Sequence, residues 1–388
     1  MTRDARNLHF APAEFEARQS ATCAAMAAAG LDALVIFRQE SMYWLTGYDT
    51  FGYVHFQAMV LTGDGALTLL TRSADRLQAH FTSVLEDIRI WIDGADAAPE
   101  TDLRAILAEH GLAGKRLGVE WDAYGLTAAR GRRVAEALEG FATLTDASAL
   151  VTELRAVKSP AEIAHVRHAA KLADAALDAA VAATAPGAFE GDIWAELQGA
   201  IYRGGGDDPA NEQILGSGPG ALMCRYYTGR RHLLADDLLT LEFAAGWRHY
   251  HAALMRTIVV GRLDPRLKAM HTACLEALAA CEEALRPGEP AGTVFDAHAL
   301  AMTAHGFGAF RLNACGYSLG ATFAPSWMDW PMFYAGQPYL MRPGNVFFLH
   351  MILFDEAEGL AMSLARTSLI TETGAEPLSS APLDLIRR

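Results

Sequence analysis

Amphipathic stretches alternate with short, continuously apolar runs over the first 150 residues. The pattern over 12–29, which ends at Gly30, predicts a helix, and the run DALVIF after it predicts a buried strand. Further strands are expected at QAMVLTG, ALTLLTR and RLGVEWD, the last preceded by a helix over 103–110. Strands that alternate with helices indicate a small α/β domain over residues 1–150.

The pattern changes after residue 150, which predicts a second domain over 151–388. Ser159 is a candidate helix N-cap, because Pro160 occupies the first helical position and Glu162 stands three residues after the serine. A long amphipathic helix is expected to follow. Other helices are expected over 193–202, 266–285 and 293–305, and strands at NVFFLHMILF and RTSLIT. Helices and strands that are grouped separately indicate an α+β domain.

The stretch LTLEFAAGWRHYHAALMRTIVVG, residues 239–261, predicts two apolar strands around a turn at residues 246–248. Glu242 is the one acidic residue in the first of these strands. Burying a carboxylate without a partner costs several kcal/mol, so a metal ion, a substrate or a structural hydrogen bond should accompany it.

Composition narrows the class of protein. The chain has 388 residues and is 52% hydrophobic, which is typical of an ordered globular protein. A net charge of −14 argues against nucleic-acid binding, which requires a basic face. The start of the chain lacks the apolar core of a signal peptide, and no run of about twenty apolar residues predicts a membrane span. Five cysteines, not spaced as metal ligands, favour reduced thiols and a cytoplasmic location.

Five segments occur in an order that resembles the creatinase/aminopeptidase P family. They are LRAVKSPAEIAHVRHAA, LEFAAGWRHYHAALMRT, GYSLG, LMRPGNVFFLHM and TSLITETGAEPL. The resemblance covers nearly the whole chain and implies an α+β pita-bread catalytic domain after a smaller α/β creatinase-type N-terminal domain. In this family the N-terminal domain of a partner subunit often closes the pocket. The resemblance therefore implies a homodimer, with Tyr48 and Phe51, together with Tyr53 and His55, as candidate pocket residues.

Metallopeptidases of this family bind two divalent metal ions through two Asp, one His and two Glu. The matching positions here hold Glu242, Ala253, Tyr317, His350 and Ala365. The two alanines cannot coordinate a metal, and the remaining Glu and His fall short of the three ligands of an open zinc site. The resemblance to this ligand set therefore implies no metal and no other cofactor, with Glu242 facing a substrate.

Two metal-free branches of the family offer comparisons. The hairpin, GYSLG, and the Pro325 and Trp327 pair are similar to ectoine hydrolase. Creatinase is less similar, because its pocket His and carboxylate correspond to Arg225 and Met255. The resemblance implies a metal-independent hydrolase of a non-peptide C–N bond in a small zwitterionic or carboxylate-bearing substrate. A creatinase-like amidinohydrolase of another guanidino or amide compound, and a catalytically inactive binding protein, are the alternatives.

The family's metal positions also imply which side chains of the hairpin point toward the pocket. If positions 242 and 253 both face the pocket, His251 faces it too, whereas Arg256 points away and is best explained by a structural ion pair. Glu242 and His251 then form a candidate acid/base or nucleophile pair, the alternative being a hydrogen bond that serves only the core.

Other candidate site residues follow from their chemistry. His350 is a candidate proton donor, and Tyr317 a candidate hydrogen-bond donor to a developing oxyanion. Arg225 offers two parallel hydrogen bonds to a substrate carboxylate, although an exposed loop arginine is equally expected. The candidate contacts to the body of the substrate are aromatic: Tyr227, Phe323 and Trp327.

Overall fold

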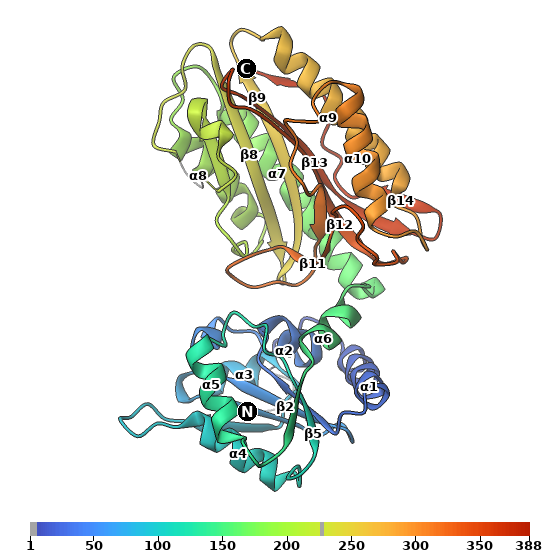
Figure 1. The fold of residues 1–388 in the computed structure, drawn as a ribbon. Coiled ribbons are helices and arrows are strands. Elements are labelled where there is room, and N and C mark those ends of the chain that lie inside the picture. The colour runs from blue at the N-terminus through green and yellow to red at the C-terminus, as the bar shows by residue number, and fades with distance from the viewer. Residues whose placement is uncertain (1–5, 226–228) are drawn as a thin grey trace. The chain divides into compact units, whose positions relative to one another are not determined.

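The computed structural model describes residues 6–225 and 229–388 (Figure 1). The chain forms two compact units, an N-terminal one that ends at Arg155 and a C-terminal one that begins at Ala156. The division lies at the end of helix α6 (Ser148–Arg155), slightly beyond the boundary expected after residue 150.

The N-terminal unit is a six-stranded mixed sheet with helices, in the strand order β4-β3-β2-β1-β5-β6. Strands β1 to β3 pair antiparallel, and the outer pairs are parallel. The strands are β1 (Ala33–Ile36), β2 (Ala58–Thr62), β3 (Leu67–Arg72), β4 (Asp87–Trp91), β5 (Arg116–Val119) and β6 (Thr143–Asp146). The helices before α6 are α1 (Pro12–Ala28), α2 (Gln39–Thr46), α3 (Arg76–Thr82), α4 (Pro99–Glu109) and α5 (Ala128–Ala137). This arrangement confirms the expected small α/β domain.

The C-terminal unit is built on a nine-stranded sheet, most of it in the order β11-β10-β12-β13-β9-β8-β7. Its long strands are β8 (Asp237–Trp247), β9 (Tyr250–Val260), β12 (Val346–Asp355) and β13 (Leu360–Thr371). The short ones are β7 (Ile214–Ser217), β10 (Gly316–Ser318), β11 (Asp329–Met332), β14 (Gly374–Pro377) and β15 (Ile386–Arg387). Its helices are α7 (Pro160–Ala183), α8 (Glu190–Arg203), α9 (Pro265–Ala284) and α10 (Gly292–Ala304).

Helix α7 begins where the sequence predicts. The Ser159 side chain accepts a hydrogen bond from the Glu162 backbone N–H, and the Glu162 carboxylate accepts one from the Ser159 backbone N–H at 2.9 Å. This reciprocal pair satisfies two backbone donors that the first turn otherwise leaves without partners.

The β8–β9 hairpin turns at Arg248 and His249, slightly later than expected, because β8 continues to Trp247. Both turn residues have positive φ, 52° and 64°, a conformation that usually favours Gly or Asn in two-residue turns. Contacts outside the hairpin hold His249. Its backbone N–H donates to the Asp207 carboxylate at 2.9 Å, and its ring stacks on Phe323 with centroids 4.1 Å apart.

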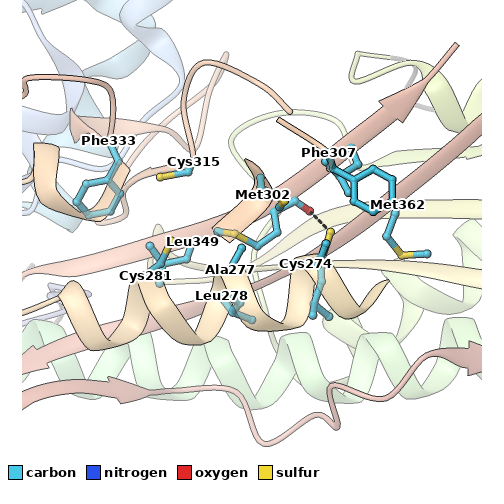
Figure 2. Packing of buried hydrophobic residues seen from close by; sticks show 14 of the residues in the cluster. Cys274, Ala277, Leu278, Cys281, Met302, Phe307, Cys315, Phe333, Leu349 and Met362 are labelled. Carbon is cyan, nitrogen blue, oxygen red and sulfur yellow. Dashed lines mark hydrogen bonds between the residues drawn. The ribbon is translucent and has the colours of Figure 1, made fainter. Parts of the chain in front are cut away.

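The two faces of this sheet have different roles. Alternate apolar residues of β8 and β9, among them Leu241, Phe243 and Leu254, pack against α7 and α8. Strands β12 and β13 pack in the same way against α9 and α10 around a sulfur-rich core, shown in Figure 2, in which Cys274 and Met302 lie. Because helices cover one face, the intervening side chains of these strands point to the other, inner face.

Strands β9 and β13 share a short ladder of two register pairs, Arg256 with Leu364 and Met255 with Ala365. Threonine hydroxyls continue the connection at either end. Thr367 Oγ1 accepts from the Ala253 backbone N–H at 2.9 Å and donates to the Ala253 carbonyl at 3.0 Å. At the other end, Thr257 Oγ1 accepts from the Ser363 backbone N–H at 2.8 Å.

No helix in the described ranges is both long enough and apolar enough to cross a membrane. All five cysteines are free thiols.

Candidate active site

Glu242 lies in a row of residues that crosses four strands on the inner face. It is opposite Met255 on β9, Met255 is opposite Ala365 on β13, and Ala365 is opposite His350 on β12. Residues opposite each other in antiparallel strands share a face. The register therefore places the only two titratable side chains of this row, Glu242 and His350, on the same side of the sheet.

The Glu242 carboxyl is almost wholly buried, with 8% of the residue exposed. Burial raises its pKa from 4.5 to about 7, although the positive charge of Arg225 and a hydrogen bond from Tyr317 act in the opposite direction. The carboxyl lines a cavity of about 10 Å³, which is space for about one water molecule. Most other lining side chains are apolar or contain sulfur, among them Met223, Cys224, Met255, Ile352, Phe354 and Met362.

Tyr317, on β10, connects Glu242 to the aromatic loop that follows β10, residues 319–328. Its hydroxyl accepts a hydrogen bond from Trp327 Nε1 at 2.8 Å and makes a further hydrogen bond with Glu242. Burial, followed by the negative charge of Glu242, holds the pKa of Tyr317 well above its usual range. The Trp327 backbone N–H donates to Asn211 Oδ1 at 3.1 Å, so Asn211 holds the backbone of the residue whose indole binds Tyr317. No pattern in the sequence pointed to Asn211.

His350 lies 5.6 Å from Tyr317 between ring centroids. Burial, and then the nearby imidazole of His298, lowers the pKa of His350 to about 3, so its ring is neutral at pH 7. His298 comes from α10, is also buried and has its pKa lowered to about 4 by burial and then by the charge of Arg311. The Nδ1 atoms of both histidines are buried without a hydrogen-bond partner within the described residues. A lone histidine in an apolar helix gave no reason to predict His298.

His251 does share the inner face but does not lie beside Glu242. It is opposite Gly246, four residues along β8 and thus about 13 Å from Glu242. Both ring nitrogens have partners: Nε2 accepts from the Ala210 backbone N–H at 3.1 Å, and Nδ1 is 3.1 Å from the Thr322 hydroxyl. Burial lowers its pKa to about 4. The expected Glu242–His251 pair is therefore not formed, and His251 joins two loops to the hairpin.

Of the expected substrate contacts, Arg225 is exposed, and its positive charge partly offsets the rise in the pKa of Glu242 that burial causes. Tyr227 lies outside the described residues. Phe323 and Trp327 are both buried, and the ring of Phe323 is stacked on His249. Arg225 is thus the expected contact that combines exposure with an electrostatic effect on Glu242.

The two N-terminal candidates differ in exposure. Tyr48 is fully buried in the apolar core of its own unit, and its hydroxyl lies 3.1 Å from Thr71 Oγ1. Its ring therefore presents no surface to a substrate, contrary to expectation. Phe51 is 80% exposed.

Arg256 is buried on the opposite face, as the alternation predicts, but the expected ion pair is not its main contact. Its guanidinium donates to the carbonyls of Met255 and Ala365, each at 2.8 Å, and to that of Pro382 at 3.1 Å. Arg256 therefore joins β9, β13 and the C-terminal segment.

The residues at the family's metal positions do not fit a pair of divalent ions. Ala253 and Ala365 lie on the inner face beside Glu242, where carboxylates are required, and methyl groups donate no electron pair. Across the described ranges, no three His, Cys, Asp or Glu side chains are grouped so as to hold a metal ion. Glu242 and His350 are the donors that remain.

Comparison with known proteins identifies the family of this chain. Residues 164–372 match Metallopeptidase family M24, and residues 18–157 match the Creatinase/Prolidase N-terminal domain. The chain belongs to metallopeptidase family M24. It is a hydrolase of that family, and the expected pita-bread domain preceded by a creatinase-type domain is confirmed.

Relatives of this M24 protein span its whole length. An uncharacterised hydrolase/peptidase of Sinorhizobium fredii, y4tM, is 28% identical and covers 98% of this chain and 99% of its own. The ectoine hydrolase of Halomonas elongata is also 28% identical, with 98% of each chain covered. A dipeptidase structure from Pyrococcus horikoshii superposes with a TM-score of 0.84 at 22% identity, covering 96% of this chain and 100% of its own. At that identity the dipeptidase shows the fold alone.

Proposed function

We propose that this M24 protein hydrolyses a non-peptide C–N bond in a small zwitterionic substrate, in the manner of an ectoine hydrolase and without a pair of metal ions. One observation carries the proposal. Glu242 is a buried carboxyl with a pKa of about 7, hydrogen-bonded to Tyr317, at a position where the neighbouring metal-ligand positions are alanines. The full-length ectoine hydrolase relative supports the substrate class.

A carboxyl with a pKa of about 7 is suited to both halves of such a reaction. As a carboxylate it accepts a proton from the water that attacks the amidine carbon, and a C–O bond forms. Glu242 returns that proton to one amidine nitrogen, and it then carries the proton of the new hydroxyl to the other nitrogen, which leaves as the C–N bond breaks and the carbonyl forms. The balance is one cyclic amidine and one water consumed, and one amide with a free amine produced.

Other residues have separate roles in this scheme. Tyr317 donates to Glu242 and so stabilises its carboxylate form. Arg225, which is exposed, binds the substrate carboxylate. His350 is neutral at pH 7 and serves as a hydrogen-bond partner for the substrate through its unpaired Nδ1. Because the cavity has room for only about one water molecule, substrate binding requires that lining side chains move, and the half-exposed Met223 is the first candidate.

The test is proton NMR of the purified full-length protein with ectoine in excess EDTA. Appearance of acetylated diaminobutyrate supports the proposal, provided that Glu242→Gln abolishes it. Unchanged ectoine rejects this substrate, and guanidino and amide zwitterions are then assayed in the same way.

Membership of metallopeptidase family M24 defines the competing activity, a metal-dependent peptidase. Xaa-Pro dipeptides are therefore assayed with added Mn²⁺ or Co²⁺. Metal-stimulated cleavage of a dipeptide, with none of the zwitterions hydrolysed in EDTA, would overturn the proposed function.

A further inference from the structure

The carboxyl of Glu190, outside the Glu242 cavity, joins two distant points of the chain. Glu190 is the first residue of α8 and is 1% exposed. One of its oxygens, Oε1, accepts hydrogen bonds from the Ser217 backbone N–H at 2.7 Å and from the Ser217 hydroxyl. The other, Oε2, accepts from the Arg231 backbone N–H at 3.2 Å. Glu190 therefore holds the chain where it leaves β7 and again 14 residues later.

The returning chain packs directly on this carboxyl. Arg231 Nη1 donates to the Ser217 hydroxyl oxygen and to the Asp237 carboxylate, each at 2.6 Å, so its guanidinium makes a second link to the end of β7. At Gly229, an added Cβ would lie 1.3 Å from Glu190 Oε2. Only glycine allows the backbone to approach the carboxyl this closely.

Between these two points the chain supplies one wall of the Glu242 cavity. This cavity wall consists of Ala221, Met223 and Cys224. Arg225 follows them, and its positive charge partly offsets the rise in the pKa of Glu242 that burial causes. The cavity wall and the arginine assigned to the substrate carboxylate thus belong to the same stretch of chain.

The polar attachments of this stretch are at its ends. Among the described residues, the hydrogen bonds made by 218–225 remain within the stretch, as from the Met223 backbone N–H to the Gly220 carbonyl at 3.1 Å. Apolar packing is non-directional, so it holds the cavity wall in the core without fixing the direction of the backbone. The position of Arg225 therefore depends on the two ends that Glu190 joins.

We propose that Glu190 is a positioning residue of the candidate active site, which holds the cavity wall and Arg225 against Glu242. A carboxylate is suited to this role, because its two oxygens accept from donors at both ends of the stretch at once. The effect on substrate binding rests on the proposed function, whereas the placement of the cavity wall does not.

The test measures how fast iodoacetamide alkylates each cysteine of the purified protein, read by peptide mass spectrometry. Cys224 reports on the cavity wall, since it is partly buried, and burial and then the charge of Glu242 raise its pKa. The thiolate is the reactive form, so displacement of the cavity wall should speed its alkylation. Cys274, Cys281 and Cys315 are buried in the apolar core and report global unfolding.

Two variants break the same contact from opposite sides. Glu190→Gln keeps the acceptor for Ser217 but turns an amide donor toward the Arg231 backbone N–H. Gly229→Ala leaves Glu190 in place and pushes a methyl group against it, which keeps the test open if the first variant does not fold. The matched control is Glu162→Gln, which alters another buried carboxyl, on α7, that accepts from the Tyr250 hydroxyl.

Alkylation of Cys224 that is at least about tenfold faster in either variant, with the three core cysteines unchanged, supports the proposal. Glu162→Gln should alkylate like the wild type. The proposal is overturned if Cys224 reacts at the wild-type rate in both variants, if all four cysteines react faster together, or if Glu162→Gln has the same effect on Cys224.

Steady-state rates measure the consequence for the substrate. In Glu190→Gln we expect KM to rise at least about tenfold and kcat to stay within about threefold, because Arg225 is displaced while Glu242 remains on β8. An unchanged KM beside faster alkylation of Cys224 would overturn the role of Glu190 in the active site. If no zwitterion is hydrolysed, the proposed function fails, and the alkylation rates still decide whether Glu190 places the cavity wall.

Discussion

The Trp327 indole donates its Nε1 hydrogen to the Tyr317 hydroxyl oxygen at 2.8 Å. Because this bond uses a lone pair of the phenol, the phenolic hydrogen remains free to be donated to Glu242, and that donation lowers the pKa of the carboxyl. The indole thus sets the direction of the hydrogen bonds at the site, and Tyr317 acts on Glu242 as a donor.

Replacement of the proposed acid/base residue should abolish turnover. We expect Glu242→Gln to lower kcat at least about 10²-fold, because an amide neither accepts nor returns the proton. Steady-state rates on the substrate found by NMR measure this effect. Glu196→Gln, an exposed change on α8, is the control and should leave kcat unchanged. A Glu242→Gln variant with wild-type kcat would remove this residue from the mechanism.

The same substitution should change how stability depends on pH. Below pH 4.5 the Glu242 carboxyl is protonated in both folded and unfolded states. Between 4.5 and about 7 only the unfolded state ionises, so the free energy of unfolding falls as pH rises, by about 3 kcal/mol in total. Glu242→Gln lacks this loss. Its free energy of unfolding should therefore rise relative to that of the wild type as the pH increases from 4.5 to 7.

Denaturant unfolding at pH 5, 6 and 7.5 measures the difference between the two proteins. Glu120, a second buried carboxyl whose pKa burial raises to about 7, is present in both and cancels. A difference in unfolding free energy that does not change with pH would show that the pKa of Glu242 is not raised.

Loss of the phenol should shift the pH dependence of catalysis. Tyr317→Phe removes a donor to the Glu242 carboxylate, so the pKa of that carboxyl rises and the acidic limb of the kcat/KM profile moves to higher pH. Tyr250→Phe is a matched control, since that buried hydroxyl donates at 2.7 Å to Glu162 on α7. It should lower stability without moving the profile. Coincident profiles for Tyr317→Phe and the wild type would contradict the assigned role.

His251 should matter for stability and not for chemistry. His251→Ala leaves the Ala210 backbone N–H without its acceptor, which should lower the free energy of unfolding by about 1–3 kcal/mol. We expect kcat to stay within about threefold of the wild type. Thermal unfolding and steady-state rates at a temperature where both proteins are folded separate the two effects. A collapse of kcat at unchanged stability would restore the acid/base role expected from the sequence.

The elements that follow a clear period could be predicted from the sequence, and those without one could not. Helix α7 has an amphipathic pattern and a capping box, and both were visible. Helix α2 was missed because all eight of its residues are buried, so no polar face reveals a helical period. Strands β10 and β11 have three and four residues, too few for alternation to be recognised.

For the candidate site, the sequence pattern predicted which face of the sheet a residue occupies, but not the distances between residues. Alternation along the hairpin correctly placed Glu242 and His251 on one face. It could not show their separation along the strands, nor that the acceptor on His251 is used by Ala210, a loop residue 41 positions away. The contribution of His298 likewise depends on how α10 packs, which the pattern of a single helix does not contain.

The threonine contacts between β9 and β13 have a consequence for exchange with solvent deuterium. The amide hydrogens of Ala253 and Ser363 are bonded to side-chain hydroxyls, not to the carbonyl of a neighbouring strand. Rotation of one threonine side chain releases each of them, whereas the amides of β8 and β9 that donate to each other's carbonyls are released only when the strands separate. The floor of the candidate site therefore contains amides that open locally, those of Ala253 and Ser363 among them, within strands whose other pairing is through the backbone.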